Sequence, residues 1–173
     1  MPATPRTARA LALALAGLGL TTSTMSAMPA TAASGDGATT TEVRTAARKV
    51  SARVLGARDT ALRQRGDQYA YGGSGPDRFD CSGLIYYSFR RAGFAVPRTS
   101  SAQAGFAHRV AKADMRPGDL MFFYGSGGVY HAAIFLRWSR GHALMVHSPG
   151  SGQRVQVAVP WTSQWFGATL RRR

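Results

Sequence analysis

The sequence predicts an α+β fold in which N-terminal helices pack on a small antiparallel β-sheet. Apolar residues recur at helical spacing between residues 42 and 106, whereas short apolar runs separated by glycine-rich turns fill the region after residue 117. Helices followed by strands are typical of α+β proteins and not of a doubly wound parallel sheet, in which the two alternate. The composition, 45% hydrophobic and 17% charged, is that of a chain that can build a packed core.

Residues 1–33 have the pattern of a secretory signal peptide. Two arginines precede a run of Ala, Leu and Gly over residues 10–20, and small residues at Ala30 and Ala32 predict cleavage directly after them. The run is shorter than the roughly 20 residues that a membrane-spanning helix needs. We therefore expect a secreted protein, associated with the cell wall, that has no transmembrane segment.

Residues 34–50 are predicted to be a flexible basic linker that leads into a helix. Small and polar residues dominate up to position 41, and apolar residues then recur every three or four positions from Glu42 to Arg65, opposite a row of arginines. Gly56 is a potential break in this helix. A solvated amphipathic helix is the plainer interpretation, and contact with a wall or membrane surface is the alternative.

The next elements surround the single cysteine. A glycine-rich turn leads to a helix that is expected to begin at Cys81, with Asp80 as its N-terminal cap and Gly93 as its stop. A second short helix is predicted over Thr99–Phe106. The predicted strands are residues 120–123, 130–136, 143–147, 155–159 and 166–170.

The net charge of +14, from 22 Lys and Arg against 8 Asp and Glu, favours a polyanionic partner. For an exported chain the abundant polyanions are cell-wall polymers and anionic lipid headgroups. No zinc-finger or RNA-binding motif accompanies the charge, so a nucleic-acid partner is not expected. We expect the basic surface to contact anionic wall polymers, and we expect a monomer.

Cys81 is the only cysteine, which excludes an internal disulfide and a cysteine-based zinc cluster. Such a thiol is buried and inert, paired between molecules, or a nucleophile. Its polar neighbours and the preceding glycine-rich loop favour an exposed, nucleophilic thiol. Its position at the N-terminus of a helix favours the same role, since that position stabilises a thiolate.

A cysteine nucleophile needs a base and a group that orients the base. His131 opens one apolar strand and His147 closes the next, so antiparallel pairing would bring both to one end of the sheet. A structural histidine is the alternative for each taken alone. His108 and His142 lie in expected loops, and we interpret them as structural.

Metal and cofactor sites are not predicted. The two strand histidines, Asp119 and Cys81 lack the HExxH or CxxC spacing of a zinc site, and the glycine-rich loops lack phosphate-binding fingerprints. We therefore expect neither a metal nor a cofactor.

Residues 69–84, which end in Phe-Asp-Cys-Ser-Gly-Leu, resemble the nucleophile segment of the NlpC/P60 family of cell-wall peptidases. The resemblance covers residues 55–173 and departs from the family at Gln68, where proline is common. It continues in order through residues 96–100, 116–120, 131–134 and 146–149.

This resemblance implies a permuted papain-like fold for residues 51–173, the expected catalytic domain. It implies that Tyr71 lies beside the thiol and helps to hold the reacting carbonyl, and that Asp80 and Ser82 bind substrate. The implied catalytic residues are Cys81 as nucleophile, His131 as base and His147 as the residue that orients the base.

The implied activity is hydrolysis of the γ-D-glutamyl–diaminopimelate (or lysine) bond of a peptidoglycan stem peptide by a Cys81 thiolate. The alternatives are an N-acetylmuramoyl-L-alanine amidase, a peptidase of free stem peptides, and a catalytically silent wall-binding module. An effector against a competitor's wall would use the same chemistry.

Overall fold

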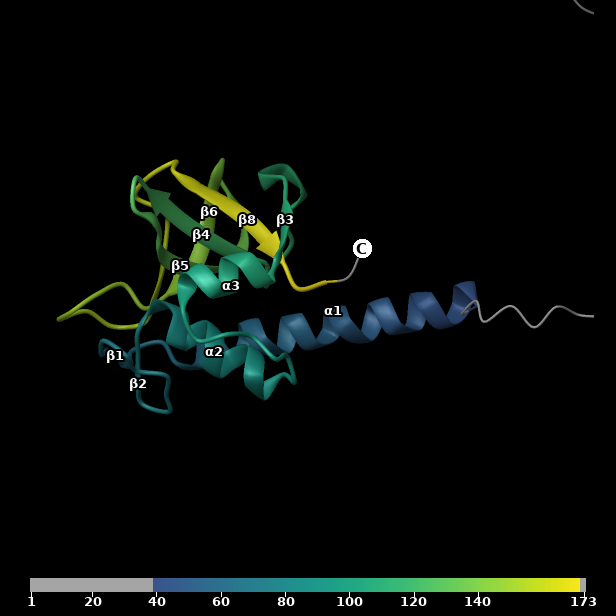
Figure 1. Ribbon diagram of the computed structural model, residues 1–173, viewed down its shortest axis with the longest axis horizontal. Coiled ribbons are helices and arrows are strands. Elements are labelled where there is room, and N and C mark those ends of the chain that lie inside the picture. Colours follow the sequence, from purple (N-terminus) through teal and green to yellow (C-terminus); the bar gives the residue numbers. More distant parts are fainter. Residues whose placement is uncertain (1–38, 172–173) are drawn as a thin grey trace, which may run out of the picture. The chain divides into compact units, whose positions relative to one another are not determined.

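The computed structural model describes residues 39–171, and the predicted leader lies outside the described residues. Three α-helices lie on one side of a six-stranded sheet (Figure 1). The helices are α1 (Thr40–Arg63), α2 (Cys81–Arg91) and α3 (Ser100–Phe106), with a 3-10 turn at Lys112–Asp114. The strands are β1 (Gln68–Tyr69), β2 (Arg78–Phe79), β3 (His108–Val110), β4 (Leu120–Gly125), β5 (Gly128–Ser139), β6 (His142–His147), β7 (Gln156–Ala158) and β8 (Trp165–Thr169).

Helix α1 begins at Thr40, two residues before the expected start at Glu42, and ends at Arg63, two residues before the expected end at Arg65. Thr39 and Glu42 form a reciprocal capping box that fixes its first turn. The helix continues through Gly56 without a break, because glycine at a single helical position costs only about 1 kcal/mol. Residues 40–49 are exposed on all sides, and the part of α1 that packs on the domain begins near Val54.

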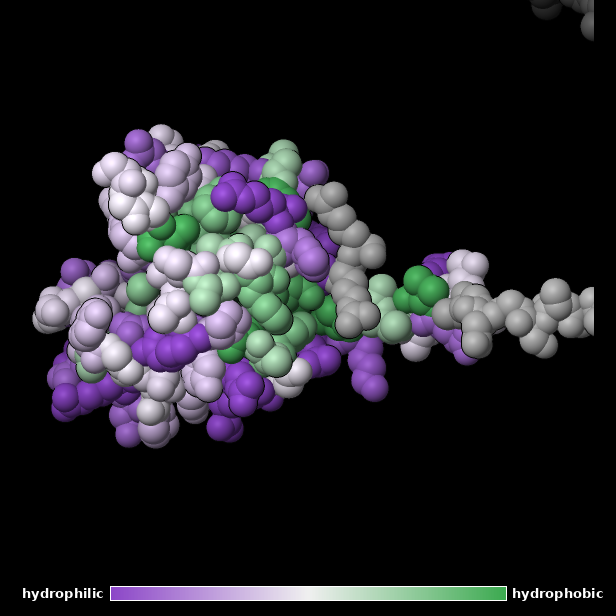
Figure 2. Space-filling view, viewed as in Figure 1, coloured by the Kyte–Doolittle hydropathy of each residue, from purple (hydrophilic) through white to green (hydrophobic). Residues whose placement is uncertain are grey.

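Arg53, which the helical pattern assigned to the solvated face of α1, instead holds the end of α2. Its Nε donates to the Ala92 carbonyl at 2.7 Å, and its Nη2 donates to the Gly93 carbonyl. The guanidinium carbon lies 4.4 Å from the centre of the Phe94 ring. A cation at the C-terminal end of a helix is favourable. Apolar residues gather over α3 and toward α1 on the face shown in Figure 2. A groove of about 450 Å³ is lined by residues that include Ala46, Val50, Phe94, Phe106 and Leu170.

The sheet has the order β3-β8-β4-β5-β6-β7, and every neighbouring pair is antiparallel. One core lies between the helices and the sheet, and includes Leu84 and Phe89 of α2 against Phe122 and Ile134. A second core on the other face includes Met121, Phe123, Phe135, Met145 and Trp165. The α+β architecture is confirmed, and β1, β2 and β3 are the strands that hydrophobic periodicity missed, because two or three residues are too few to show a period.

A buried ion pair closes the C-terminal end of the domain. Arg171 pairs with Asp119, and the Thr169 hydroxyl donates to the same carboxylate at 2.6 Å. Asp119 is 1% exposed and Arg171 is 5% exposed. The pair therefore ties the residues after β8 to the turn before β4. Within residues 39–171, no helix has both the length and the hydropathy to cross a bilayer.

Candidate active site

Cys81 is the first residue of α2 and lies in a cavity of about 580 Å³. The glycine-rich turn folds back over the start of this helix, and the Asp80 N–H donates to the Gly73 carbonyl at 2.9 Å. Gly83 permits this approach, because a Cβ at that position would lie only 1.9 Å from the same carbonyl oxygen. The cavity is lined by Tyr69, Tyr71, Gly72, Asp80, Cys81, Ser82, Arg98, Thr99, Ser100 and Tyr130.

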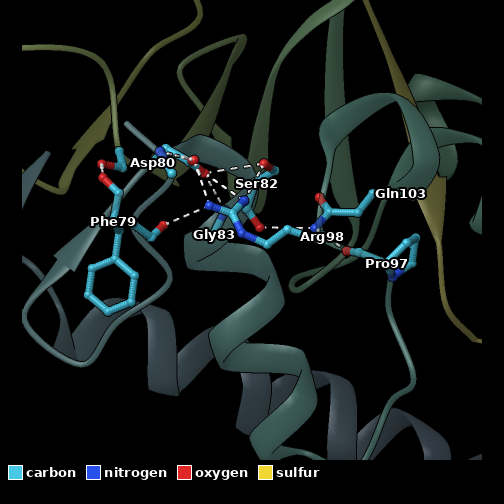
Figure 3. A network of polar contacts seen from close by, with 10 residues as sticks. Phe79, Asp80, Ser82, Gly83, Pro97, Arg98 and Gln103 are labelled. Atoms are coloured by element: carbon cyan, nitrogen blue, oxygen red, sulfur yellow. Dashed lines mark hydrogen bonds and ion pairs between the residues drawn. The ribbon is translucent and has the colours of Figure 1, made fainter. Parts of the chain in front are cut away.

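The Asp80 carboxylate is the centre of a polar network at the helix start (Figure 3). It caps α2 by accepting the Gly83 N–H at 2.7 Å and accepts the Gly72 N–H at 2.9 Å. Arg98 binds both carboxylate oxygens, at 3.0 and 2.7 Å. Ser82 donates to Asp80 at 3.2 Å and accepts from Arg98 at 3.0 Å.

These contacts change the role that the resemblance implied for Asp80 and Ser82. A carboxylate offers about four lone-pair positions, and Asp80 already accepts five hydrogen bonds. Both side chains are buried, at 8% and 6% exposure. Burial raises the pKa of Asp80, but the hydrogen bonds from Arg98, Gly83 and Gly72 outweigh it and hold the pKa below its usual range. Asp80 and Ser82 therefore position the loop and helix around the thiol, with no carboxylate lone pair left for substrate.

The ionisation of Cys81 differs from the expectation of a stabilised thiolate. Burial raises the pKa of the thiol, and the negative charge of Asp80 adds to that effect. The backbone N–H groups of Ala132, Ser82 and Cys81 itself act in the opposite direction and lower the pKa of the thiol. Burial prevails, so the neutral thiol is the favoured form of the free protein.

His131 and His147 meet at one end of the sheet, as the strand pattern predicts. Ile134 of β5 pairs with Val146 of β6, so His147 lies opposite Ala133, on the same face as His131. The two rings contact at 3.0 Å between His131 Nε2 and His147 Nδ1. His131 Nδ1 therefore remains for another partner.

Aromatic rings enclose the histidine pair, which is 5% and 3% exposed. The Trp161 ring centre lies 5.1 Å from that of His131 and 5.8 Å from that of His147, and the Trp161 ring stacks on Phe123 at 4.6 Å. Burial and the neighbouring His147 lower the pKa of His131 to about 3, and burial lowers the pKa of His147 to about 4. Both imidazoles are therefore neutral above about pH 5.

Strand β5 connects the histidine pair to the cysteine. The backbone N–H of Ala132, the residue after His131, acts on the Cys81 thiol and lowers its pKa. A thiol and two imidazoles are the kinds of side chain that serve as nucleophile, base and orienting group in cysteine hydrolases.

Comparison with known proteins agrees with this geometry. The sequence profile of the NlpC/P60 family matches residues 66–173, which is more than half of the chain. The chain belongs to the NlpC/P60 family. A relative from Mycobacterium bovis, named a "Probable endopeptidase", is 45% identical over 103 residues, which are 60% of this chain and 25% of the relative. The "Probable endopeptidase p60" of Listeria monocytogenes is 38% identical over 92 residues, 53% of this chain and 18% of the relative. The chain thus spans about a quarter or less of the length of these curated relatives.

Solved NlpC/P60 structures share the fold. The peptidoglycan hydrolase RipB of Mycobacterium tuberculosis superposes with a TM-score of 0.61 at 30% identity, covering 75% of this chain and 69% of RipB. RipD of the same organism superposes with a TM-score of 0.57 at 27% identity, covering 68% of this chain and 97% of RipD. RipD is described as a non-catalytic NlpC/p60 domain protein adapted to peptidoglycan binding, so the family includes members with and without catalysis.

Two tyrosines of this NlpC/P60 domain, Tyr69 and Tyr71, line the cavity that holds Cys81. Burial, followed by the charge of Cys81, raises the pKa of the Tyr69 hydroxyl. Tyr71 lines the same cavity, but 94% of its side chain is exposed. The two-residue strand β1, paired with β2, fixes the side that Tyr69 faces, whereas Tyr71 follows in the turn.

Three residues of the NlpC/P60 site were not selected from sequence: Tyr69, Arg98 and Trp161. Arg98 lies in a recognised motif, and its preceding proline and following Thr99 cap are the signals that it belongs to a fixed turn. Trp161 lies in a loop with no periodicity to indicate its contacts. His108 and His142 are exposed in β3 and β6, away from the pair. In the part of the chain that the structure describes, no group of three or more His, Cys, Asp or Glu is arranged to hold a metal.

Proposed function

We propose that this protein is a secreted cysteine endopeptidase that hydrolyses the γ-D-glutamyl–diaminopimelate (or lysine) bond of peptidoglycan stem peptides. The observation that carries the proposal is the position of Cys81 as the first residue of α2 in an open cavity, together with the 3.0 Å contact between His131 and His147 at one end of the sheet. The curated relatives are named endopeptidases, and RipB is a peptidoglycan hydrolase. The leader pattern of residues 1–33 supports export.

The first chemical step follows from the neutral resting state. His131 Nδ1 takes the proton of the Cys81 thiol as the sulfur attacks the amide carbonyl. We assign His131 Nε2–H as the donor to His147 Nδ1 in their 3.0 Å contact, because this tautomer leaves His131 Nδ1 free as a base. Because both groups begin uncharged, charge develops only as the reaction proceeds, and its stabilisation lowers the barrier.

The later steps need hydrogen-bond donors for the oxyanion and a proton for the leaving amine. The N–H of Cys81 at the helix start and the Tyr69 hydroxyl are the proposed oxyanion donors, with Tyr69 in the role first expected of Tyr71. A donor of this kind contributes about 3 kcal/mol to transition-state stabilisation. His131 then protonates the departing amine, and water hydrolyses the thioester that links Cys81 to the glutamyl γ-carboxyl group.

The test is digestion of purified peptidoglycan and defined muropeptides, with products identified by mass spectrometry. Fragments that end at D-glutamate, absent with Cys81→Ala, are expected. Cleavage between muramic acid and L-alanine would instead assign an amidase, and cleavage of free stem peptides alone would assign a recycling peptidase. Binding to peptidoglycan without cleavage by the folded, reduced protein would assign a wall-binding module like RipD.

A second part of the proposal concerns retention on the wall. The exposed residues 40–49 of α1 carry Arg44, Arg48 and Lys49 away from the packed domain (Figure 1). We propose that these cations hold the protein on anionic wall polymers. Wall binding is then expected to weaken as salt rises, since exposed charges are screened beyond about 10 Å at 0.1 M.

A further inference from the structure

A further groove of the domain, separate from the Cys81 cavity, is lined by tryptophan side chains. All three tryptophans of the chain, Trp138, Trp161 and Trp165, line one depression of about 460 Å³. Trp138 is 42% exposed and Trp161 is 56% exposed. Large apolar rings gathered at an open surface mark interaction sites in soluble proteins. The other lining residues are Lys112, Gly141, His142, Ala143, Val159, Pro160, Thr162 and Ser163.

The exposed rings are held rigidly from below. Trp161 stacks on Phe123 with 8° between the ring planes, and Trp138 packs on Phe135 at 5.5 Å between ring centres. Lys112 lies 4.0 Å from the centre of the Trp165 ring and donates to the Ser163 carbonyl at 3.0 Å. A ligand would therefore meet preformed ring faces, and little side-chain ordering would oppose binding.

The chemistry of the lining selects among ligands. Flat indole faces beside hydroxyl, imidazole and ammonium groups suit a ligand with apolar faces and hydroxyl-bearing edges, which describes a pyranose ring. The lining contains no carboxylate, and Lys112 already lies over the Trp165 ring, so its positive charge opposes the binding of a second cation there. A stable protein partner buries about 800 Å² on each side, which is more than such a small depression offers.

The position of the groove connects it to the candidate active site. Trp161 belongs to both regions, because its ring contacts His131 and His147 and also lines the groove. The residue before His131, Tyr130, lines the cavity that holds Cys81. The histidine pair thus contacts one residue of the tryptophan groove, and His131 follows a residue of the Cys81 cavity in sequence.

We propose that the tryptophan groove binds the saccharide strand of peptidoglycan while an attached stem peptide reaches Cys81. The proposal rests on the proposed function for the identity of the polymer. It predicts that the protein binds peptide-free glycan strands and that it cleaves polymeric peptidoglycan more efficiently than the same bond in a short free peptide.

The test compares Trp138→Ala with Phe106→Ala, an exposed aromatic residue that lies outside the groove. Co-sedimentation of the full chain with peptide-free glycan strands is measured at 0.1 and 0.5 M NaCl. We expect about tenfold weaker binding for Trp138→Ala at both salt concentrations, the value of one lost stacking contact, and unchanged binding for Phe106→Ala. Trp138→Phe keeps a flat ring and is expected to retain binding, which controls for a folding defect.

The groove proposal would be overturned if the unaltered chain did not bind glycan strands, or if Trp138→Ala left the binding intact. Binding lost at 0.5 M NaCl would also overturn it, because the basic surface would then be responsible. Hydrolysis of a short stem peptide is measured in parallel with Trp138→Ala and is expected to be unchanged. Failure of that hydrolysis in the unaltered chain refutes the peptidase proposal, while a Trp138-dependent glycan interaction would still establish the groove.

Discussion

Mild acid is expected to destabilise this fold through its two buried histidines. His131 and His147 have pKa values of about 3 and about 4 when folded, against 6.5 for an ordinary histidine. The unfolded chain therefore binds more protons than the folded chain below pH 6.5, and stability falls as the pH drops from 6.5 toward 4. Above pH 6.5 both states are neutral at these residues and the effect vanishes.

The magnitude follows from the size of the shifts. At pH 5 an unfolded-state histidine with a pKa of 6.5 is protonated, whereas the folded-state residues are not. The difference of 1.5 units between 6.5 and 5 corresponds to about 2 kcal/mol for each residue, or about 4 kcal/mol for the pair. This is a large part of the 5–15 kcal/mol by which a typical domain is stable.

The assay is urea unfolding at pH 7.5 and pH 5.0, followed by far-UV circular dichroism. We expect the free energy of unfolding to be about 4 kcal/mol lower at pH 5.0. His147→Asn removes one of the two groups and is expected to reduce the loss to about 2 kcal/mol, whereas His108→Asn, at an exposed histidine, should leave it unchanged. A loss below 1 kcal/mol in the unaltered chain would refute the reasoning.

Three further predictions concern the catalytic groups. Burial and Asp80 disfavour the Cys81 thiolate, so the rate of alkylation by iodoacetamide, followed against pH, should give an apparent pKa above that of free N-acetylcysteine measured alongside. An apparent pKa well below that of N-acetylcysteine would contradict a neutral thiol in the resting protein. His147→Ala should lower kcat/KM about a hundredfold, whereas His147→Asn keeps an acceptor for His131 and should retain most activity; equal losses in steady-state kinetics would argue against an orienting role. Arg98→Gln leaves the buried Asp80 charge without its partner and should lower the free energy of unfolding in urea by about 3 kcal/mol. Arg44→Gln, on the exposed part of α1, is the control and should leave the free energy of unfolding unchanged; similar losses in both variants would refute a stabilising role for the Arg98–Asp80 pair.

Much of the candidate site could be predicted because local rules act on it. An Asp before Cys-Ser-Gly and a run of apolar residues specify a capped helix, and the structure has Asp80 as the cap of α2. The histidine pair followed from one property of antiparallel strands: the start of one lies beside the end of the next. His131 and His147 meet at 3.0 Å, as that property predicts.

The remaining features depend on burial and on loop conformation, which no periodicity encodes. The position of Cys81 at a helix N-terminus predicts a lowered pKa for the thiol, but the direction of the shift is set by the burial of the sulfur, which raises it. Tyr69 and Tyr71 are two positions apart with similar neighbours, and only the pairing of β1 with β2 distinguishes them. Trp161 comes from a loop whose course over the histidines is decided by tertiary packing with Phe123.

The central claim is that Cys81 forms a thioester with the acyl part of a stem peptide. The most direct measurement is intact-protein mass spectrometry of the enzyme mixed with a disaccharide tripeptide and quenched with acid during turnover. The account predicts an adduct with the mass of the disaccharide–L-alanyl–D-glutamyl group, mapped by peptide analysis to Cys81 and absent from Cys81→Ala. Product formation without an adduct, or an adduct on another residue, would contradict it.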